Sequence, residues 1–227
     1  MIDKWELLDT LAAQFKLFMH DNFLSTDKIN SAVLGTGEVT DAVMSLKLST
    51  GILSNSYAKI YYELPLFNPH YSQIIFRVRL NSMASCIAFF GFKETSADPS
   101  FDMNESHAGI LVYNGKVYAS TGRLVSEGPP AIYEQQRVEI TGIDMTRDFL
   151  YKIIGSSFYT QPLPQIIPYF DTFRIITPDR IWTLNSANTT YPPNDHVHYI
   201  VAFIKNFVNS NKYLDISHIT YGEEYAD

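Results

Sequence analysis

Short runs of apolar residues, separated by turn residues, fill the chain from Asn30 onward. In the run from Ile75 to Leu80, Arg77 and Arg79 alternate with apolar residues, so one face of a strand would be polar and the other apolar. Many short runs of this kind predict an all-β sandwich rather than alternating strands and helices. The predicted strands span residues 42–48, 58–63, 73–80, 85–92, 107–113, 116–120, 137–143, 149–154, 157–162, 172–176, 199–206 and 213–221.

One turn between these strands is specified by its dipeptide. Asn114 and Gly115 separate two apolar runs, and this pair tolerates positive φ at both centres of a type I′ turn. The sequence therefore predicts a tight hairpin over residues 112–117. The proline-rich stretch 161–168 and the polar stretch 185–196 are predicted to be loops, because proline removes a ladder donor and Asn, Ser and Thr favour turns.

The first 20 residues have the spacing of an amphipathic helix. Asp3 followed by Glu6 is a capping arrangement that favours a helix start. The sequence therefore predicts a short N-terminal helix over 1–20 and a β-sandwich domain over 21–227. The helix would either cover one end of the sandwich or mediate self-association or attachment to a larger assembly, and residues 15–23 could instead form a first strand. The apolar stripe of this helix consists of Trp5, Leu8, Leu11, Phe15 and Phe18.

Composition and charge narrow the class of protein. The chain has 227 residues, 46% of them hydrophobic, and this is enough to bury a core within one domain. The net charge of -7 and the lack of any run of Lys or Arg argue against nucleic acid as a partner. The start of the chain has neither a signal-peptide pattern nor an apolar stretch long enough to span a membrane. Cys86 is the only cysteine, which favours folding in a reducing compartment.

Several segments resemble the concanavalin A-like lectin and glucanase superfamily, which includes the laminin G-like domains. Asp21-Asn-Phe23 followed by residues 35–39 is similar to the opening of that family, and Leu214 to Tyr221 is similar to its closing edge strand. Residues 76–80, 88–92, 136–140 and 148–160 resemble its inner strands. The resemblance implies a two-sheet antiparallel jelly-roll sandwich.

Within this family, the glucanase branch carries the sequence Glu-x-Asp-x-x-Glu along one strand. Retaining glycosidases need two carboxyl groups about 5 Å apart, and alternation on that strand supplies them. The corresponding strand here, His107 to Tyr113, contains no acid, and the nearest acids, Asp102 and Glu105, precede it. We therefore predict a non-catalytic binding or structural module at a virion, cell or particle surface. The alternatives are a carbohydrate-active enzyme with carboxylates from different strands, and a soluble lectin.

Candidate binding residues follow from side-chain chemistry. Sugar rings stack on aromatic faces, and the aromatic residues in loop-like segments are Tyr133, Tyr159, Tyr169, Trp182 and Tyr191. His196 and His198 would share one face of a strand, a weak metal-site pattern. A calcium ion held by Asp21 and Asp215 is implied by family resemblance alone. No other cofactor is expected, and Cys86 is interpreted as a buried thiol.

Overall fold

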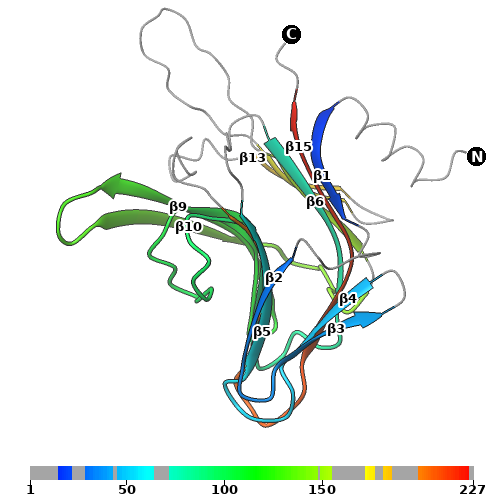
Figure 1. Ribbon diagram of the computed structural model, residues 1–227. Helices are drawn as coiled ribbons and strands as arrows, with labels where there is room; N and C mark the ends of the chain where they lie inside the picture. The colour runs from blue at the N-terminus through cyan, green and yellow to red at the C-terminus, as the bar shows by residue number, and fades with distance from the viewer. Residues whose placement is uncertain are drawn as a thin grey trace, which may run out of the picture.

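The computed structural model consists of two antiparallel β-sheets that pack face to face (Figure 1). It describes residues 15–21, 29–42, 45–63, 72–147, 149–154, 172–176, 181–185 and 199–224. Every regular element within these ranges is a strand. No helix of the described part is therefore long and apolar enough to cross a membrane. The predicted all-β, two-sheet antiparallel sandwich is confirmed.

The first sheet contains eight strands arranged around one long strand near the C-terminus. Its members are β1 (Phe15–Asp21), β3 (Glu38–Ala42), β4 (Ser45–Ser49), β6 (Ser72–Leu80), β11 (Phe149–Ile154), β12 (Thr172–Ile176), β13 (Ile181–Asn185) and β15 (Tyr213–Glu224). The order is β13-β12-β11-β6-β15-β4-β3. One side of β15 pairs with β6, and the other side pairs with β4 along its first half and with β1 along its second half.

The second sheet contains seven strands in the order β10-β9-β8-β7-β14-β5-β2. They are β2 (Asn30–Leu34), β5 (Tyr57–Glu63), β7 (Cys86–Lys93), β8 (His107–Tyr113), β9 (Lys116–Ser126), β10 (Ile132–Glu139) and β14 (Tyr199–Asn206). The long hairpin of β9 and β10, drawn in green, curves away from the first sheet (Figure 1). The sheet is therefore concave on the face that points away from its partner.

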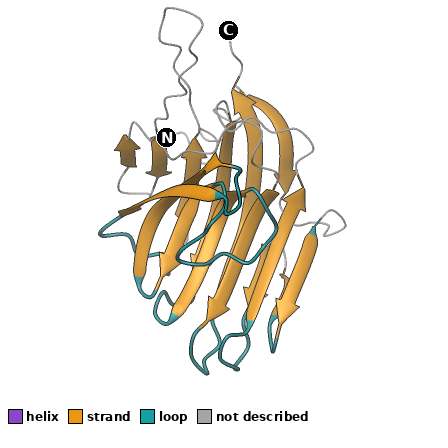
Figure 2. Ribbon diagram, turned by 90° about the vertical axis from the view of Figure 1, so that its left-hand side faces the viewer, coloured by secondary structure: helices purple, strands orange, loops and turns teal. Residues whose placement is uncertain are grey.

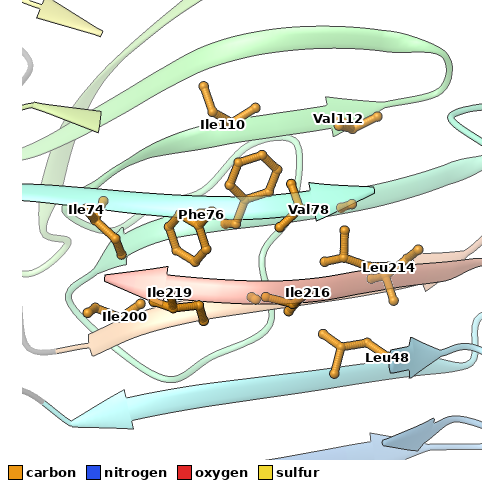
Figure 3. Close-up of a cluster of buried hydrophobic side chains, with 14 of the residues drawn as sticks. Leu48, Ile74, Phe76, Val78, Ile110, Val112, Ile200, Leu214, Ile216 and Ile219 are labelled. Carbon is orange, nitrogen blue, oxygen red and sulfur yellow. The ribbon is translucent and has the colours of Figure 1, made fainter. Parts of the chain in front are cut away.

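The main core lies between the two sheets and is built of aliphatic and aromatic side chains (Figure 3). Phe76 on β6 and Phe90 on β7 meet across it with ring centroids 5.2 Å apart, in the edge-to-face arrangement that aromatic rings prefer. Both side chains are fully buried, and burial of each stabilises the fold by roughly 1.5–3 kcal/mol. Around them pack Leu48, Ile74, Val78, Ile110, Val112, Ile200, Leu214, Ile216 and Ile219.

The predicted N-terminal helix is wrong over residues 15–20, because Phe15–Asp21 forms strand β1. The alternative of a first strand over 15–23 is confirmed over 15–21. Phe15 and Phe18 fit a helical spacing, but apolar residues at every second position from Phe15 fit a strand equally well. Pairing with β15 decides between the two patterns. The remaining residues of the predicted stripe, Trp5, Leu8 and Leu11, lie outside the described residues.

Most predicted strands coincide with observed ones, and β8, β11, β12 and β14 have the predicted bounds. The short strands β2, β3 and β13 were not predicted from the pattern, and the predicted strand 157–162 lies outside the described residues. β10 spans Ile132–Glu139 rather than 137–143. The reason is its partner β9, which continues to Ser126 and offers hydrogen bonds to the earlier residues.

The hairpin between β8 and β9 has the predicted turn. Asn114 has a φ of 50° and Gly115 a φ of 90°, so both central residues are in the positive region. A residue outside the hairpin also stabilises the turn, since the Gly115 N–H donates to the Met83 carbonyl at 2.8 Å. A Cβ atom added at Gly115 would meet no atom within 4 Å. The glycine is therefore required for its backbone conformation and not for space.

We expect Gly115→Val to lower the free energy of unfolding by about 1–3 kcal/mol, because a β-branched residue is strained at positive φ. Gly115→Asn is the matched control, since asparagine tolerates this region and should cost clearly less. Urea unfolding of both variants measures the difference. Equal stability of the valine and asparagine variants would contradict a role for backbone strain at this turn.

Candidate active site

The second sheet is buried on both of its faces. On its outer face, away from the first sheet, Phe89 of β7 is paired in register with Leu111 of β8 and Phe203 of β14. These three side chains are fully buried in a second hydrophobic cluster. An antiparallel sheet that packs a core on one face commonly leaves the other in water. The partly buried aromatic residues that complete this cluster are Tyr57, Tyr61, Phe101, Tyr113, Tyr118, Tyr199 and Phe207.

The cover of this outer face is the loop of residues 94–106, here called the strap, which joins β7 to β8. In Figure 2, loop segments lie in front of the strands of this sheet. On one side the strap is held by β5, where Lys59 Nζ lies 2.7 Å from Asp98 Oδ1. On the other side it is held by β10, where an Arg137 guanidinium nitrogen lies 2.8 Å from Asp102 Oδ1. Because β5 and β10 have four strands between them, the strap spans most of the sheet.

Apolar side chains of the strap fill the space over the sheet. The ring centroid of Phe101 lies 4.5 Å from that of Tyr113 on β8. The guanidinium carbon of Arg137 lies 4.1 Å above the Phe101 ring, a favourable cation–π distance. Met103 is buried in the same cluster. The middle of the outer face is therefore occupied by the chain itself.

A buried ion pair fixes the two ends of the strap. Lys93, the last residue of β7, is fully buried, and its Nζ lies 2.7 Å from Glu105 Oε1. The other carboxylate oxygen of Glu105 accepts a hydrogen bond from Thr95 Oγ1 at 2.8 Å. The Lys93 ammonium also donates to the carbonyl of Ala97. Burial lowers the pKa of Lys93, and the adjacent Glu105 carboxylate opposes that shift.

His107 stands next to this pair at the start of β8 and is completely buried. Its Nδ1 lies 2.9 Å from the Glu105 carbonyl oxygen, which can only accept, so Nδ1 carries the proton. In the neutral ring Nε2 is then the acceptor for the Ser120 hydroxyl at 2.8 Å. Burial lowers the pKa of His107 to about 4, and the positive charges of Lys93 and Arg137 act in the same direction. His107 is therefore a neutral structural link between the strap and β9.

A second glutamate lies beside Glu105. Glu94 directly follows Lys93, is half-buried, and accepts a hydrogen bond from the Ser106 N–H at 2.9 Å through Oε2. Its charge also acts on the Tyr133 side chain on β10. Partial burial and the nearby carboxylates of Glu94 and Glu105 raise the pKa of Tyr133. Both glutamates therefore act electrostatically on one phenol.

Glu94 and Glu105 both lie at the base of the strap, and both raise the pKa of Tyr133. The two glutamates come from the ends of adjacent strands, since Glu94 follows β7 and Glu105 precedes β8. The central strands β7, β8 and β14 themselves carry no Asp or Glu. The strand predicted over His107–Tyr113 is confirmed, and carboxylates lie beyond its ends rather than on it.

Of the predicted glycan-binding residues, Tyr133 is the one whose pKa these carboxyl groups raise. Trp182 is on β13, at the far edge of the other sheet. Tyr159, Tyr169 and Tyr191 lie outside the described residues. The predicted set is therefore not shown to form one binding surface.

Of the predicted metal ligands, Asp21 and Asp215 are not brought together. Asp215 on β15 forms an ion pair with Arg79 at 2.8 Å. Asp21 is paired four residues further along β15, which separates the two backbones by roughly 13 Å. His196 and His198 lie outside the described residues. Within the described ranges there is no cluster of three or more His, Cys, Asp or Glu residues that could hold a metal ion.

The interpretation of Cys86 as a buried thiol is confirmed. Its side chain is fully buried, and burial raises its pKa to about 11. A thiol with such a pKa carries almost no thiolate at neutral pH. Cys86 therefore contributes to packing, and a role as a nucleophile is not supported.

Lys93, Glu94 and Glu105 were not identified from the sequence as parts of one site. Glu105 lies outside the strand in which the glucanase pattern places its acids, and it comes 11 positions after Glu94. One signal is present in the sequence: Lys93 and Glu94 end a run that is otherwise apolar from Cys86. A charge at the end of an apolar strand is common, so this signal alone does not mark a site.

Comparison with solved structures identifies the fold. The laminarinase from Rhodothermus marinus is similar over 93% of this chain and 98% of that chain, with a TM-score of 0.60 and 11% sequence identity. The laminarinase catalytic domain from Thermotoga petrophila RKU-1 has a TM-score of 0.58 at 10% identity, over 93% and 99% of the two chains. A glycoside hydrolase family 16 endo-glucanase from Bacteroides ovatus has a TM-score of 0.58 at 11% identity, over 89% and 99%. No protein-family model and no curated protein sequence matches the chain. The fold is a concanavalin A-like jelly roll.

These comparisons contradict the prediction of a non-catalytic binding or structural module. The similar structures are catalytic glycoside hydrolases, and they favour the alternative of a carbohydrate-active enzyme. These comparisons do not support a structural role in a virion or an oligomeric particle. The prediction rested on the absence of acids from one strand, and it did not consider Glu94 and Glu105, which follow β7 and precede β8.

We expect the stability of the protein to fall as the pH is lowered from 6.5 to 4, in part because of His107. Its folded-state pKa of about 4 lies below its ordinary value of 6.5, so the unfolded chain takes up a proton that the native protein does not. This group alone should lower the free energy of unfolding by about 3 kcal/mol over that interval.

His107→Gln tests this, because glutamine keeps one donor and one acceptor but does not titrate. Urea unfolding of both proteins at pH 7, 5.5 and 4 should give a stability difference that shrinks or reverses at low pH. A difference that is independent of pH would contradict the burial of a neutral histidine.

Proposed function

We propose that this protein is a carbohydrate-active enzyme that cleaves glycosidic bonds, with Glu94 and Glu105 as its carboxyl pair. The observation that carries the proposal is the position of both glutamates at the base of the strap, where Glu94 accepts a hydrogen bond from the Ser106 N–H at 2.9 Å and Glu105 lies 2.7 Å from the Lys93 ammonium. The fold supports it, since the similar structures include laminarinases and an endo-glucanase. Hydrolysis of a glycosidic bond needs one group that gives a proton and one that attacks or activates water.

The surroundings of the two glutamates suggest different roles. Glu105 is almost buried and bound to the Lys93 ammonium, so it suits the charged partner that attacks the sugar or activates a water molecule. Glu94 is more exposed and accepts a hydrogen bond from the Ser106 N–H. It suits the acid that protonates the leaving oxygen.

Aromatic residues near the pair offer a surface for sugar rings. Tyr199 of β14 is paired in register with Lys93, and its ring centroid lies 6.0 Å from that of Tyr61 on β5. Both tyrosines are half-buried, so each keeps part of its ring accessible. Aromatic faces of this kind stack on sugars while the hydroxyl groups remain hydrated. We propose that a polysaccharide binds at this end of the outer face.

We expect Glu94→Gln and Glu105→Gln each to reduce kcat by a factor of about 10² or more, because removal of a positioned acid or base has effects of this size. The substrate panel is set by the similar structures: laminarin, mixed linkage glucan, kappa-carrageenan and mucin O-glycans. Reducing ends released by the native protein and the variants provide the measurement. Circular dichroism and urea unfolding establish that each variant is folded.

Glu139→Gln is the matched control, since Glu139 lies on β10 but forms an exposed ion pair with Lys116. Its activity should equal that of the native protein. Turnover that survives both Glu94→Gln and Glu105→Gln would overturn the assignment of the pair. Binding of a panel glycan by the native protein without any turnover would overturn the enzymatic proposal itself.

A further inference from the structure

The free edge of the second sheet is a strand with little protection. β2 is last in the order of this sheet and pairs with β5 on one side. Its residues are mostly exposed on both faces, and Val33 and Leu34 are 50% and 54% exposed. Figure 1 shows β2 running along β5 at this edge. An edge strand presents backbone donors and acceptors to any chain that can pair with it.

Other edges carry the charges that normally prevent such pairing. β10, at the opposite end of the same sheet, contains Glu134, Arg137 and Glu139, and its register with β9 is interrupted after Ile132. β3, at an edge of the first sheet, contains Glu38 and Asp41. Charges and bulges of this kind block edge-to-edge association. Among the edge strands whose side chains are described, β2 alone has neither.

The chemistry around β2 favours a second copy of the same chain as its partner. No residue from 29 to 37 is charged, so two copies can approach here without repulsion although each has a net charge of -7. Antiparallel pairing of identical strands is self-complementary about a two-fold axis. An axis at Val33 would place Val33 against Val33 of the second copy, and Leu34 against Ala32. Each of these pairs is apolar.

We propose that β2 pairs antiparallel with β2 of a second copy, centred on Val33, and joins two seven-stranded sheets into one. The contact does not depend on the proposed activity, because the carboxyl pair lies at the ends of β7 and β8, and β14 and β5 stand between these strands and β2. It also differs from self-association through the N-terminal segment, since it uses residues 30–34.

Analytical ultracentrifugation of the full chain tests the proposal from micromolar to hundreds of micromolar concentrations. The native protein should approach twice its monomer mass of 25.9 kDa. Val33→Lys should weaken the dimer at least tenfold, because the axis then brings two ammonium groups together. Val125→Lys is the matched control, since Val125 on β9 of the same sheet is 51% exposed, and its dimer should be unchanged.

A cysteine at the axis gives a second measurement that does not require a disrupted interface. Cys86 is buried, so an introduced thiol would be the accessible one. Val33→Cys should form a cross-linked dimer under mild oxidation, and Val125→Cys should not. A native protein that stays monomeric at the highest concentration would overturn the proposal, as would equal cross-linking of the two cysteine variants.

Discussion

The buried ion pair between Lys93 and Glu105 is the contact on which the candidate site depends. Lys93 is the last residue of β7, and Glu105 lies two residues before the start of β8. The ion pair between them therefore closes the base of the strap. An ammonium group without a partner would be costly at this depth, and the loop must therefore return to place Glu105 against it. The same return sets Glu94 beside Ser106 and orients the backbone of Glu105 toward His107.

The strap also explains why a seven-stranded sheet can be apolar on both faces. Its inner face packs on the first sheet, and its outer face packs on residues such as Phe101 and Met103 from the strap. This cover removes the middle of the outer face from solvent and leaves the carboxyl groups where the strap meets the strands. A polysaccharide would consequently contact the end of the sheet, near Tyr199 and Tyr133, rather than lie across its middle. The arrangement links the packing of the fold to the place at which chemistry is proposed.

The fold could be predicted from the sequence where local pattern decides it, and not where a partner strand decides it. β8 and β14 are apolar runs with clear turn residues at their ends, and their bounds were predicted correctly. β1 was ambiguous because its apolar residues fit two periods, and only pairing with β15 resolves it. The site shows the same limit. Tyr133 could be chosen by residue type. The placement of Glu94 and Glu105 at the base of the strap depends on how a loop folds back, and the spacing of residues in the sequence does not show this.

Amide hydrogen exchange across residues 94–106 tests most directly whether the buried pair holds the strap and its carboxyl groups in place. In Lys93→Met the strap should exchange much faster than in the native protein, because Glu105 is left buried without its cation. Loss of one partner of a buried pair typically costs about 3–5 kcal/mol. Lys116→Met removes an exposed ion pair with Glu139 and should leave exchange in the strap unchanged. Native-like protection of residues 94–106 in Lys93→Met would contradict the account.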